Sequence, residues 1–152
     1  MKKMVLVAVA AILCMGTAVR AQDWVVEKLR ADLRAERVAL IEEEMQFTDQ
    51  EAAVFWPIFK KYESELKAIY TERLELIGKY AENYTDMSES VADAITKKSL
   101  ELDIKEAYVR KEYFRRFKHA LTPTRAAKFF QLDGLINVLV RAQVASSLPF
   151  IE

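Results

Sequence analysis

The residues that could carry out chemistry are few in this chain, and they do not assemble into a catalytic set. His119 is the single histidine, and Cys14, the single cysteine, lies in an apolar N-terminal stretch. Carboxylates are plentiful, but their spacing marks no acid–base pair, no phosphate-binding loop and no nucleophile beside a base. A soft transition-metal site is not expected without paired histidine or cysteine ligands. We therefore predict a protein that is not an enzyme and that uses no metal or cofactor.

Three consecutive glutamates, Glu42, Glu43 and Glu44, could attract a cation or form a solvated helix end. Carboxylates near a helix C-terminus are unfavourable unless a basic group lies nearby. We therefore expect a basic neighbour, which Arg125 or Lys128 could supply.

Two groups of side chains could instead bind another molecule, one basic and one aromatic. The basic group lies where a helix is expected to end, so it could equally complement the helix dipole and pair with local glutamates. The aromatic group could equally form a core or a dimer seam. If the rings face outward beside basic side chains, the mixed surface suits weak, promiscuous binding of unfolded chains. The candidate binding residues are Phe55, Trp56, Phe59, Arg110, Arg115, Arg116 and Lys118.

A short motif that occurs twice predicts where two helices begin. The pattern [Phe/Leu]-Thr-x-x-x-Ala-Ala-x-Phe covers residues 47–55 and again residues 121–129. Threonine is a good N-cap because its hydroxyl accepts a free backbone N–H of the first turn. In the first copy a glutamate completes a capping box, and in the second a proline takes the first helical position. The predicted structural caps are Thr48, Glu51, Thr122 and Pro123.

Composition and hydrophobic spacing predict an all-α fold. The chain has only 3 glycines and 3 prolines, and apolar residues recur every three or four positions in four segments. The two middle segments are long and joined by a short polar link, so they should form a long antiparallel hairpin on which two shorter helices pack. The predicted helices cover about residues 24–45, 49–83, 89–120 and 123–146.

Two positions break the pattern of the second segment. Arg73 interrupts its apolar stripe. Pro57 lies too deep for a helix start, where it removes a hydrogen bond and clashes with the preceding turn. Either the helix is kinked near Pro57, which would bend the hairpin, or one helix ends there and another begins.

The last predicted helix has a broad apolar side. One row of residues lines this side, and a second row widens it. The first row is Phe129, Leu132, Ile136 and Leu139, and the second is Phe130, Leu135, Val138 and Val140.

The first residues have the form of an export signal. Lys2 and Lys3 precede an apolar stretch, residues 4–16, that is shorter than a membrane span. Val19 and Ala21 are small residues at the positions that a signal peptidase reads, so we expect residues 1–21 to be cleaved and the protein to be periplasmic. A retained anchor and a lipid on Cys14 are the alternatives.

Residues 22–152 are long enough for one helical domain with a core. The whole chain contains 23 Lys+Arg and 23 Asp+Glu. The charged residues of the predicted signal are all basic, so its cleavage would leave a small excess of acidic residues. This near-neutral mixture gives no reason to expect nucleic acid as a partner, and no membrane span is expected after cleavage. Loss of Cys14 leaves no disulfide, so stability must come from packing.

The Leu-Thr-Pro-x-x-x-Ala-Lys-Phe form of residues 121–129 resembles the LTXXQ-motif family of Spy/CpxP-like exported helical proteins. The resemblance implies long, bent α-hairpins, a curved homodimer and a concave surface that holds unfolded clients without ATP. Glu51 and Arg125 stand where the family has glutamine. Glutamate can keep the capping role of glutamine, whereas arginine cannot accept a hydrogen bond.

We therefore expect an exported, ATP-independent protein that acts as a chaperone or modulates a stress response by binding unfolded or partner polypeptides. The alternative is a periplasmic sensor or adaptor that docks on one membrane-associated regulator. Suppressing the aggregation of two unrelated unfolding substrates would favour the first.

Overall fold

The computed structural model describes residues 34–151 of the chain. Contacts divide the chain into two units, Met1–Leu40 and Ile41–Glu152. The described part of the first unit, residues 34–40, is helical, and this helix extends to residue 45. The expected signal peptide, its cleavage site and the beginning of the predicted first helix lie outside the described residues.

Three long helices form the second unit, and no strand occurs among the residues described. They are α3 (Asp49–Asn83), α4 (Glu89–Ala120) and α5 (Pro123–Ala145), and a 3₁₀ turn, η2 (Tyr84–Asp86), lies between α3 and α4. The all-α prediction is confirmed, and these helices begin and end close to the predicted residues. Within residues 34–151, none of the helices is both long and apolar enough to cross a membrane.

Side-chain caps explain where the three helices begin. The Thr48 hydroxyl accepts a hydrogen bond from the backbone N–H of Glu51 at 3.2 Å, and the Glu51 carboxylate accepts one from the backbone N–H of Thr48 at 3.0 Å. The hydroxyls of Ser88 and Thr122 likewise accept a hydrogen bond from the backbone N–H three residues later, which caps α4 and α5. Pro123 takes the first position of α5, where its missing N–H costs no helical bond. The predicted caps are therefore confirmed.

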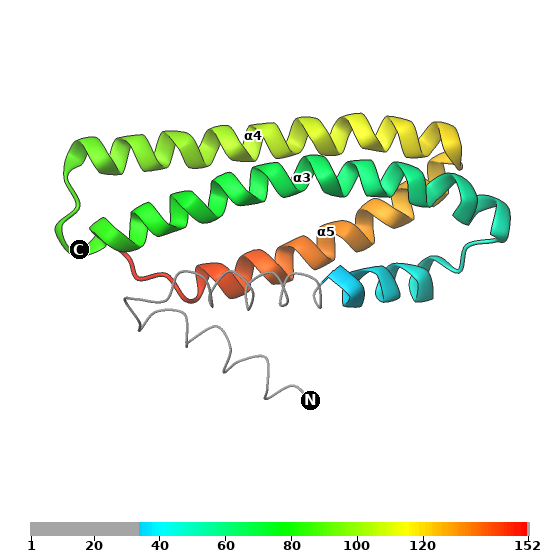
Figure 1. Cartoon of the computed structure of the whole chain (residues 1–152), viewed down its shortest axis with the longest axis horizontal. Helices are drawn as coiled ribbons and strands as arrows, with labels where there is room; N and C mark the ends of the chain where they lie inside the picture. The colour runs from blue at the N-terminus through cyan, green and yellow to red at the C-terminus, as the bar shows by residue number, and fades with distance from the viewer. Residues whose placement is uncertain (1–33, 152) are drawn as a thin grey trace, which may run out of the picture. The chain divides into compact units, whose positions relative to one another are not determined.

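Pro57 does not divide α3. The helix continues through it without ending, so the alternative of two separate helices is wrong. In Figure 1, α3 is bowed along its length. A proline inside a helix removes one backbone hydrogen bond and favours such a bend.

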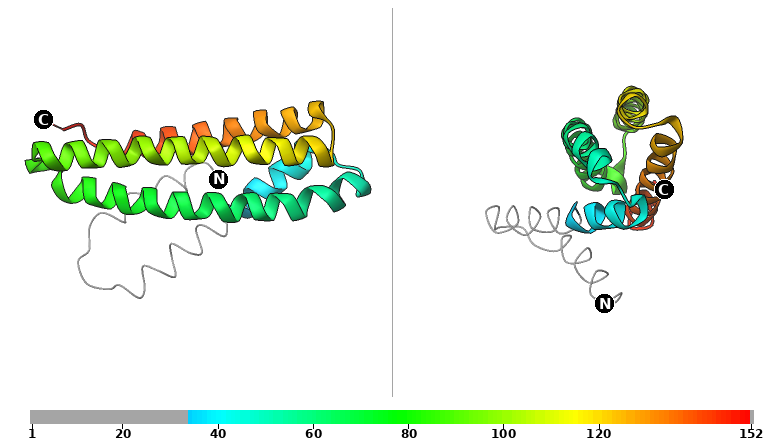
Figure 2. Two further views of the ribbon diagram at one scale, coloured as in Figure 1. Left: turned by 90° about the horizontal axis from the view of Figure 1, so that it is seen from above. Right: turned by 90° about the vertical axis from the view of Figure 1, so that its right-hand side faces the viewer.

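α4 is the central helix of this unit. It lies antiparallel to α3 and is joined to α3 by η2 (Figure 1). It also contacts α5. α3 and α5 share no close backbone contact in the described part of the chain, and in the end-on view of Figure 2 they lie to either side of α4. After α5 the chain reaches the end of α3, where the Tyr80 hydroxyl donates to the Pro149 carbonyl at 2.5 Å.

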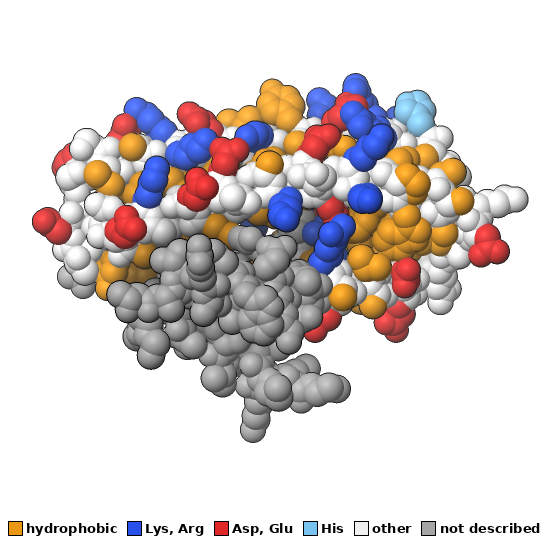
Figure 3. Space-filling model, in the orientation of Figure 1, with side chains coloured by type: hydrophobic (Ala, Val, Ile, Leu, Met, Phe, Trp, Pro, Cys, Tyr) orange, Lys and Arg blue, Asp and Glu red, His pale blue; other side chains and the backbone are white. Residues whose placement is uncertain are grey.

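The hydrophobic core occupies one half of the three-helix unit. No residue of α3 is buried beyond Ile69, and none of α4 is buried before Leu102. The buried rings meet near the start of α3, where the ring centroid of Phe117 lies 5.0 Å from that of Phe55 and 4.8 Å from that of Phe129. Hydrophobic side chains also gather at this end of the surface in Figure 3. We call it the aromatic end.

Candidate functional site

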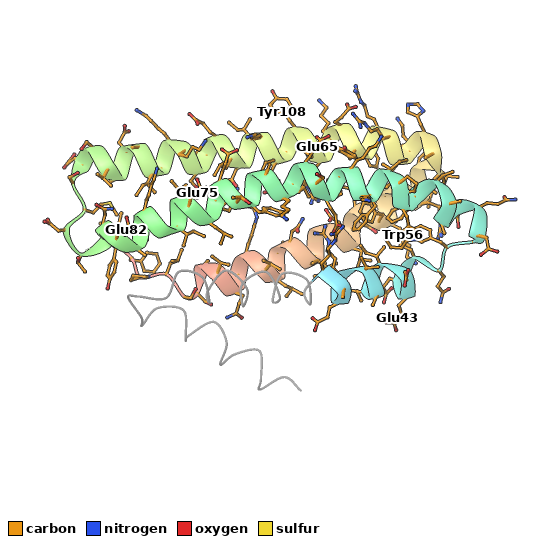
Figure 4. All side chains as sticks on the ribbon, viewed as in Figure 1. Glu43, Trp56, Glu65, Glu75, Glu82 and Tyr108 are labelled. Atoms are coloured by element: carbon orange, nitrogen blue, oxygen red, sulfur yellow. The ribbon has the colours of Figure 1, made fainter. Side chains whose placement is uncertain are left out.

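The predicted aromatic binding surface is mostly core. Phe55 and Phe59 are 0% and 2% exposed, so their prediction as binding residues is wrong. They are covered because α4 and α5 both reach the start of α3, where the Phe55 and Phe129 rings meet edge to face at 5.1 Å. Trp56, one residue further along α3, is half-buried beside them (Figure 4). Its ring lies 5.0 Å from that of Phe55.

The predicted basic surface is divided between two sides of α4. Arg110 lies on the inner side, where its side chain is 24% exposed and its guanidinium binds a buried carboxylate on α5, so it is separated from the other three predicted basic residues. Arg115, Arg116 and Lys118 are exposed. Both arginines bind Glu112 on the same helix, which cancels part of their charge.

Asp133 is the centre of a buried polar cluster that joins all three helices. Its carboxylate is 0% exposed and accepts a hydrogen bond from the Tyr62 hydroxyl at 2.9 Å. Arg110 donates to the same oxygen, and the Asn137 amide lies 3.4 Å from it. Burial opposes the charge of Arg110, but Tyr62 and Asp133 outweigh burial and raise the pKa of its guanidinium. A buried charge is tolerable only when it is paired and hydrogen-bonded in this way.

A second set of ion pairs continues from Asp133 toward the η2 end. Glu106 of α4 is 4% exposed, and its carboxylate lies 2.6 Å from the guanidinium of Arg141 on α5 and 3.6 Å from that of Arg73 on α3. Asp103 accepts from both arginines, at 2.9 Å from Arg73 and 3.2 Å from Arg141. One long arginine side chain from α3 and one from α5 therefore meet the same two acids of α4.

The sequence contains an indication of this network, but hydrophobic spacing alone does not explain it. Glu106 follows Leu102 by one helical turn, and Asp133 follows Phe129 by one turn, so both carboxylates fall in otherwise apolar stripes. Charged residues at core positions are rarely left unpaired. Arg73, predicted only to interrupt the apolar stripe of its helix, pairs with Asp103 and Glu106.

The first turns of α3 and α5 are joined to each other. Arg125 donates to both carboxylate oxygens of Glu51, and its guanidinium carbon lies 5.4 Å from the centre of the Phe47 ring. Lys128 donates to the backbone carbonyl of Glu44. A basic residue is therefore present at the end of helix 34–45, as expected, but it binds a backbone carbonyl, and Arg125 binds Glu51.

The C-terminal half of α5 exposes apolar residues on several sides. Four of them, Leu135, Val138, Leu139 and Val140, belong to the broad apolar side predicted for this helix, and the structure leaves all four exposed. A helix that is apolar all round is normally buried against a partner. The exposed residues, which we call the α5 apolar surface, are Leu135 at 57%, Val138 at 62%, Leu139 at 62%, Val140 at 54% and Val144 at 36%.

No group of three or more histidine, cysteine or acidic side chains within residues 34–151 is placed to hold a metal ion. An open groove of about 350 Å³ lies between α4 and α5, and a second concavity of about 290 Å³ lies beside Pro57. The charged residues that line the first groove are Asp103, Glu106, Arg110 and Arg141. They already have partners, since Arg141 pairs with Asp103 and Glu106, and Arg110 pairs with Asp133.

The chain matches no protein-family model, and no curated protein or solved structure was found to be similar to it.

Proposed function

We propose that this protein is an exported, ATP-independent, chaperone-like protein that binds unfolded polypeptides on the α5 apolar surface. The observation that carries the proposal is the exposure of that surface, whose five valine and leucine side chains are 36% to 62% exposed. Leu135, Val138 and Leu139 follow one another at helical spacing and form a patch on one side of α5, and exposed apolar patches of a folded protein mark interaction sites. The signal-like form of residues 1–21 and the resemblance of residues 121–129 to the LTXXQ motif support the same proposal.

The surface suits weak binding of many different sequences. Its side chains project from a single helix and do not line a closed pocket. An apolar segment of a client can therefore contact several of them without a fixed register. Arg141 and Asp103, with side chains 49% and 44% exposed, place both signs of charge beside it. Such a rim can attract charged client segments in a salt-dependent way. Weak contacts release the client without nucleotide hydrolysis.

An aggregation assay with two unrelated unfolding substrates tests the proposal. The protein should suppress light scattering by both substrates, and the double variant Leu135→Gln with Leu139→Gln should suppress it less because it removes apolar contacts. Leu74→Gln is the matched control, since Leu74 is 49% exposed on α3 and lies outside the α5 apolar surface. All three proteins should have the same circular dichroism spectrum.

Three results would contradict the proposal. One is equal suppression by the double variant and the parent protein. Another is an equal loss of suppression in the Leu74 control. The third is suppression of neither substrate, which would favour an adaptor that docks on one membrane-associated regulator.

A further inference from the structure

The concavity beside Pro57 lies between α3 and α4 at the aromatic end and has a volume of about 290 Å³. Its lining combines apolar surface with two cations, and none of its residues belongs to α5. It is therefore separate from the α5 apolar surface. We call it the Pro57 concavity, and the residues that line it are Pro57, Ile58 and Lys61 of α3 and Tyr113 and Arg116 of α4.

The apolar part of this concavity consists of Pro57, Ile58 and the ring of Tyr113. The Tyr113 hydroxyl donates to Glu65 at 2.7 Å, so its polar atom is already bonded and the ring offers a ligand only apolar surface. Small-molecule pockets have volumes of roughly 300–1,000 Å³, and this concavity is near the lower limit. It suits one apolar side chain with a little backbone beside it, and not a long segment.

The two cations of the concavity are free to bind an anion. The exposed side chain of Lys61 makes no hydrogen bond or ion pair within residues 34–151. Arg116 binds Glu112 through Nε at 3.1 Å, and its two terminal amino groups donate to no group in the described part of the chain. Glu112 is shared with Arg115, so it does not neutralise Arg116 fully. A carboxylate can therefore bind Lys61 and Arg116 without displacing an existing partner.

Pro57 also leaves a backbone acceptor beside the concavity. In an unbroken helix the Ala53 carbonyl would accept a hydrogen bond from the backbone nitrogen of residue 57, but proline has no N–H. α3 continues through Pro57, so this carbonyl keeps its helical position without its helical donor. Ala53 is exposed and lies one turn before Pro57 on the same face. Its carbonyl can therefore accept a hydrogen bond from a ligand.

From these three features we propose that the Pro57 concavity binds the free C-terminus of a polypeptide whose last residue is apolar. The terminal carboxylate binds Lys61 and Arg116, and the last side chain packs on Pro57 and Ile58. The backbone N–H of that last residue donates to the Ala53 carbonyl. Ala53, Pro57 and Lys61 follow one another by one turn, about 6 Å each, and helical side chains lean toward the N-terminus, so Lys61 extends back toward Pro57.

The backbone acceptor favours a peptide over a fatty acid. Both ligands have a carboxylate and an apolar group, but only a peptide has an N–H that can donate to the Ala53 carbonyl. This binding mode also differs from that of the α5 apolar surface, where a client has no fixed register. In the concavity the terminal carboxylate fixes the register, because it must reach both cations.

Isothermal titration calorimetry with short peptides tests the ligand class. Acetyl-Gly-Ser-Gly-Ser-Leu with a free carboxylate should bind the protein one to one. Its C-terminal amide should bind at least about tenfold more weakly, because charge-assisted hydrogen bonds are lost. A free acid that ends in serine should also bind weakly, since it buries no apolar side chain. Equal binding of the leucine acid and its amide, or binding of neither, would overturn the proposal.

Charge variants locate the peptide in the concavity. Lys61→Gln and Arg116→Gln should each weaken binding of the leucine acid by roughly tenfold, without changing the circular dichroism spectrum. Lys60→Gln is the matched control for Lys61→Gln, because Lys60 is exposed on α3 and does not line the concavity. It should bind like the parent protein. An equal loss in both lysine variants would mean that the peptide responds only to surface charge, and it would overturn the proposal.

Pro57→Ala tests the backbone acceptor. The substitution supplies the missing N–H, so the Ala53 carbonyl is bonded within the helix. Affinity for the leucine acid should fall by at least about threefold, whereas the midpoint of denaturant unfolding should not fall. Unchanged affinity would overturn the assignment to a peptide. So would octanoate that binds the parent protein as tightly as the leucine acid, since a fatty acid uses only the cations and the apolar surface.

The concavity and the α5 apolar surface fail separately in these experiments. The Leu135→Gln, Leu139→Gln variant should bind the leucine acid like the parent protein, even if it no longer suppresses aggregation. Lys61→Gln should suppress aggregation like the parent protein. Loss of peptide binding in the α5 double variant would place the peptide on α5 and overturn its assignment to the concavity.

Discussion

Arg125 of α5 binds both carboxylate oxygens of Glu51 of α3, at 2.8 and 2.9 Å. Each residue is the third of its own helix, and the two occupy the same position of the repeated motif. The two copies of the motif are therefore joined through the same position of each copy. The arginine that cannot accept a capping hydrogen bond instead binds the glutamate that completes the other cap.

Substitutions at this pair should be non-additive. Glu51→Gln and Arg125→Gln should each lower the midpoint of denaturant unfolding, because each leaves a charged group without its partner. The double variant, with glutamine at both positions, should lose less than the two single losses combined. Urea melts of the four proteins measure this coupling, and simple additivity would show that the pair does not contribute to stability.

The cap threonines should each contribute about 1 kcal/mol to the free energy of unfolding. Thr48→Ala and Thr122→Ala remove a side-chain acceptor from the first turns of α3 and α5. Thr96→Ala is the control, because Thr96 is an exposed residue within α4 and caps no helix. If the cap variants and the control melt at the same denaturant concentration, the hydroxyl groups do not determine these helix starts.

Helix boundaries could be predicted because their determinants are local. Thr48, Ser88 and Thr122 each act on backbone groups within the next turn, so a few consecutive residues contain all the information needed. Hydrophobic spacing likewise fixes which residues share one face of a helix. It correctly groups Phe55 with Phe59, but it cannot show whether that face meets another helix or a partner.

The polar contacts could not be predicted because they depend on how distant segments meet. Tyr62 and Asp133 bond directly although 71 residues separate them in the chain. Leu139 shows the opposite failure. It continues the apolar stripe of Phe129, yet it is 62% exposed, and α3 makes no close backbone contact with α5 that would cover it. The angle at which two helices pack cannot be predicted from the spacing of apolar residues in either helix.

Removing the buried carboxylate should be costly. Asp133→Ala should lower the free energy of unfolding by about 3 kcal/mol, because it leaves Arg110 and the Tyr62 hydroxyl without their acceptor. Arg110→Met combined with Asp133→Leu removes both charges and should cost less than Asp133→Ala, since no unpaired ion remains. Chemical denaturation monitored by circular dichroism compares them. A double variant at least as unstable as Asp133→Ala would contradict this interpretation.

Acid should weaken the contact between α3 and α4 through Glu72. Hydrogen bonds from Lys105, at 2.5 Å, and from Lys98, at 2.8 Å, lower the pKa of Glu72 to about 2 from its ordinary 4.5. The folded pKa is below the unfolded one, so the carboxylate stabilises the fold above pH 4.5, and this contribution is lost as the pH falls toward 2.

Denaturant midpoints measured from pH 7 down to pH 2 would show this loss. Glu72→Gln should be less stable than the parent protein at pH 7, and the difference should shrink at low pH. Glu82→Gln, an exposed position nearer the end of α3, serves as the control for removing a glutamate charge. A difference between the parent and Glu72→Gln that stays constant across this range would exclude Glu72 as the titrating group.

The absence of buried residues in α3 after Ile69 and in α4 before Leu102 means that the two halves of the α3–α4 pair need not open together. Backbone amides near η2 are protected by helical bonds and surface ion pairs, whereas amides near Phe55 and Phe117 can exchange only when the packed rings separate. Hydrogen exchange under native conditions should therefore record a gradient along each helix, fastest near η2 and slowest at the aromatic end. The end of the hairpin can then fluctuate and re-form many times while the aromatic end stays folded.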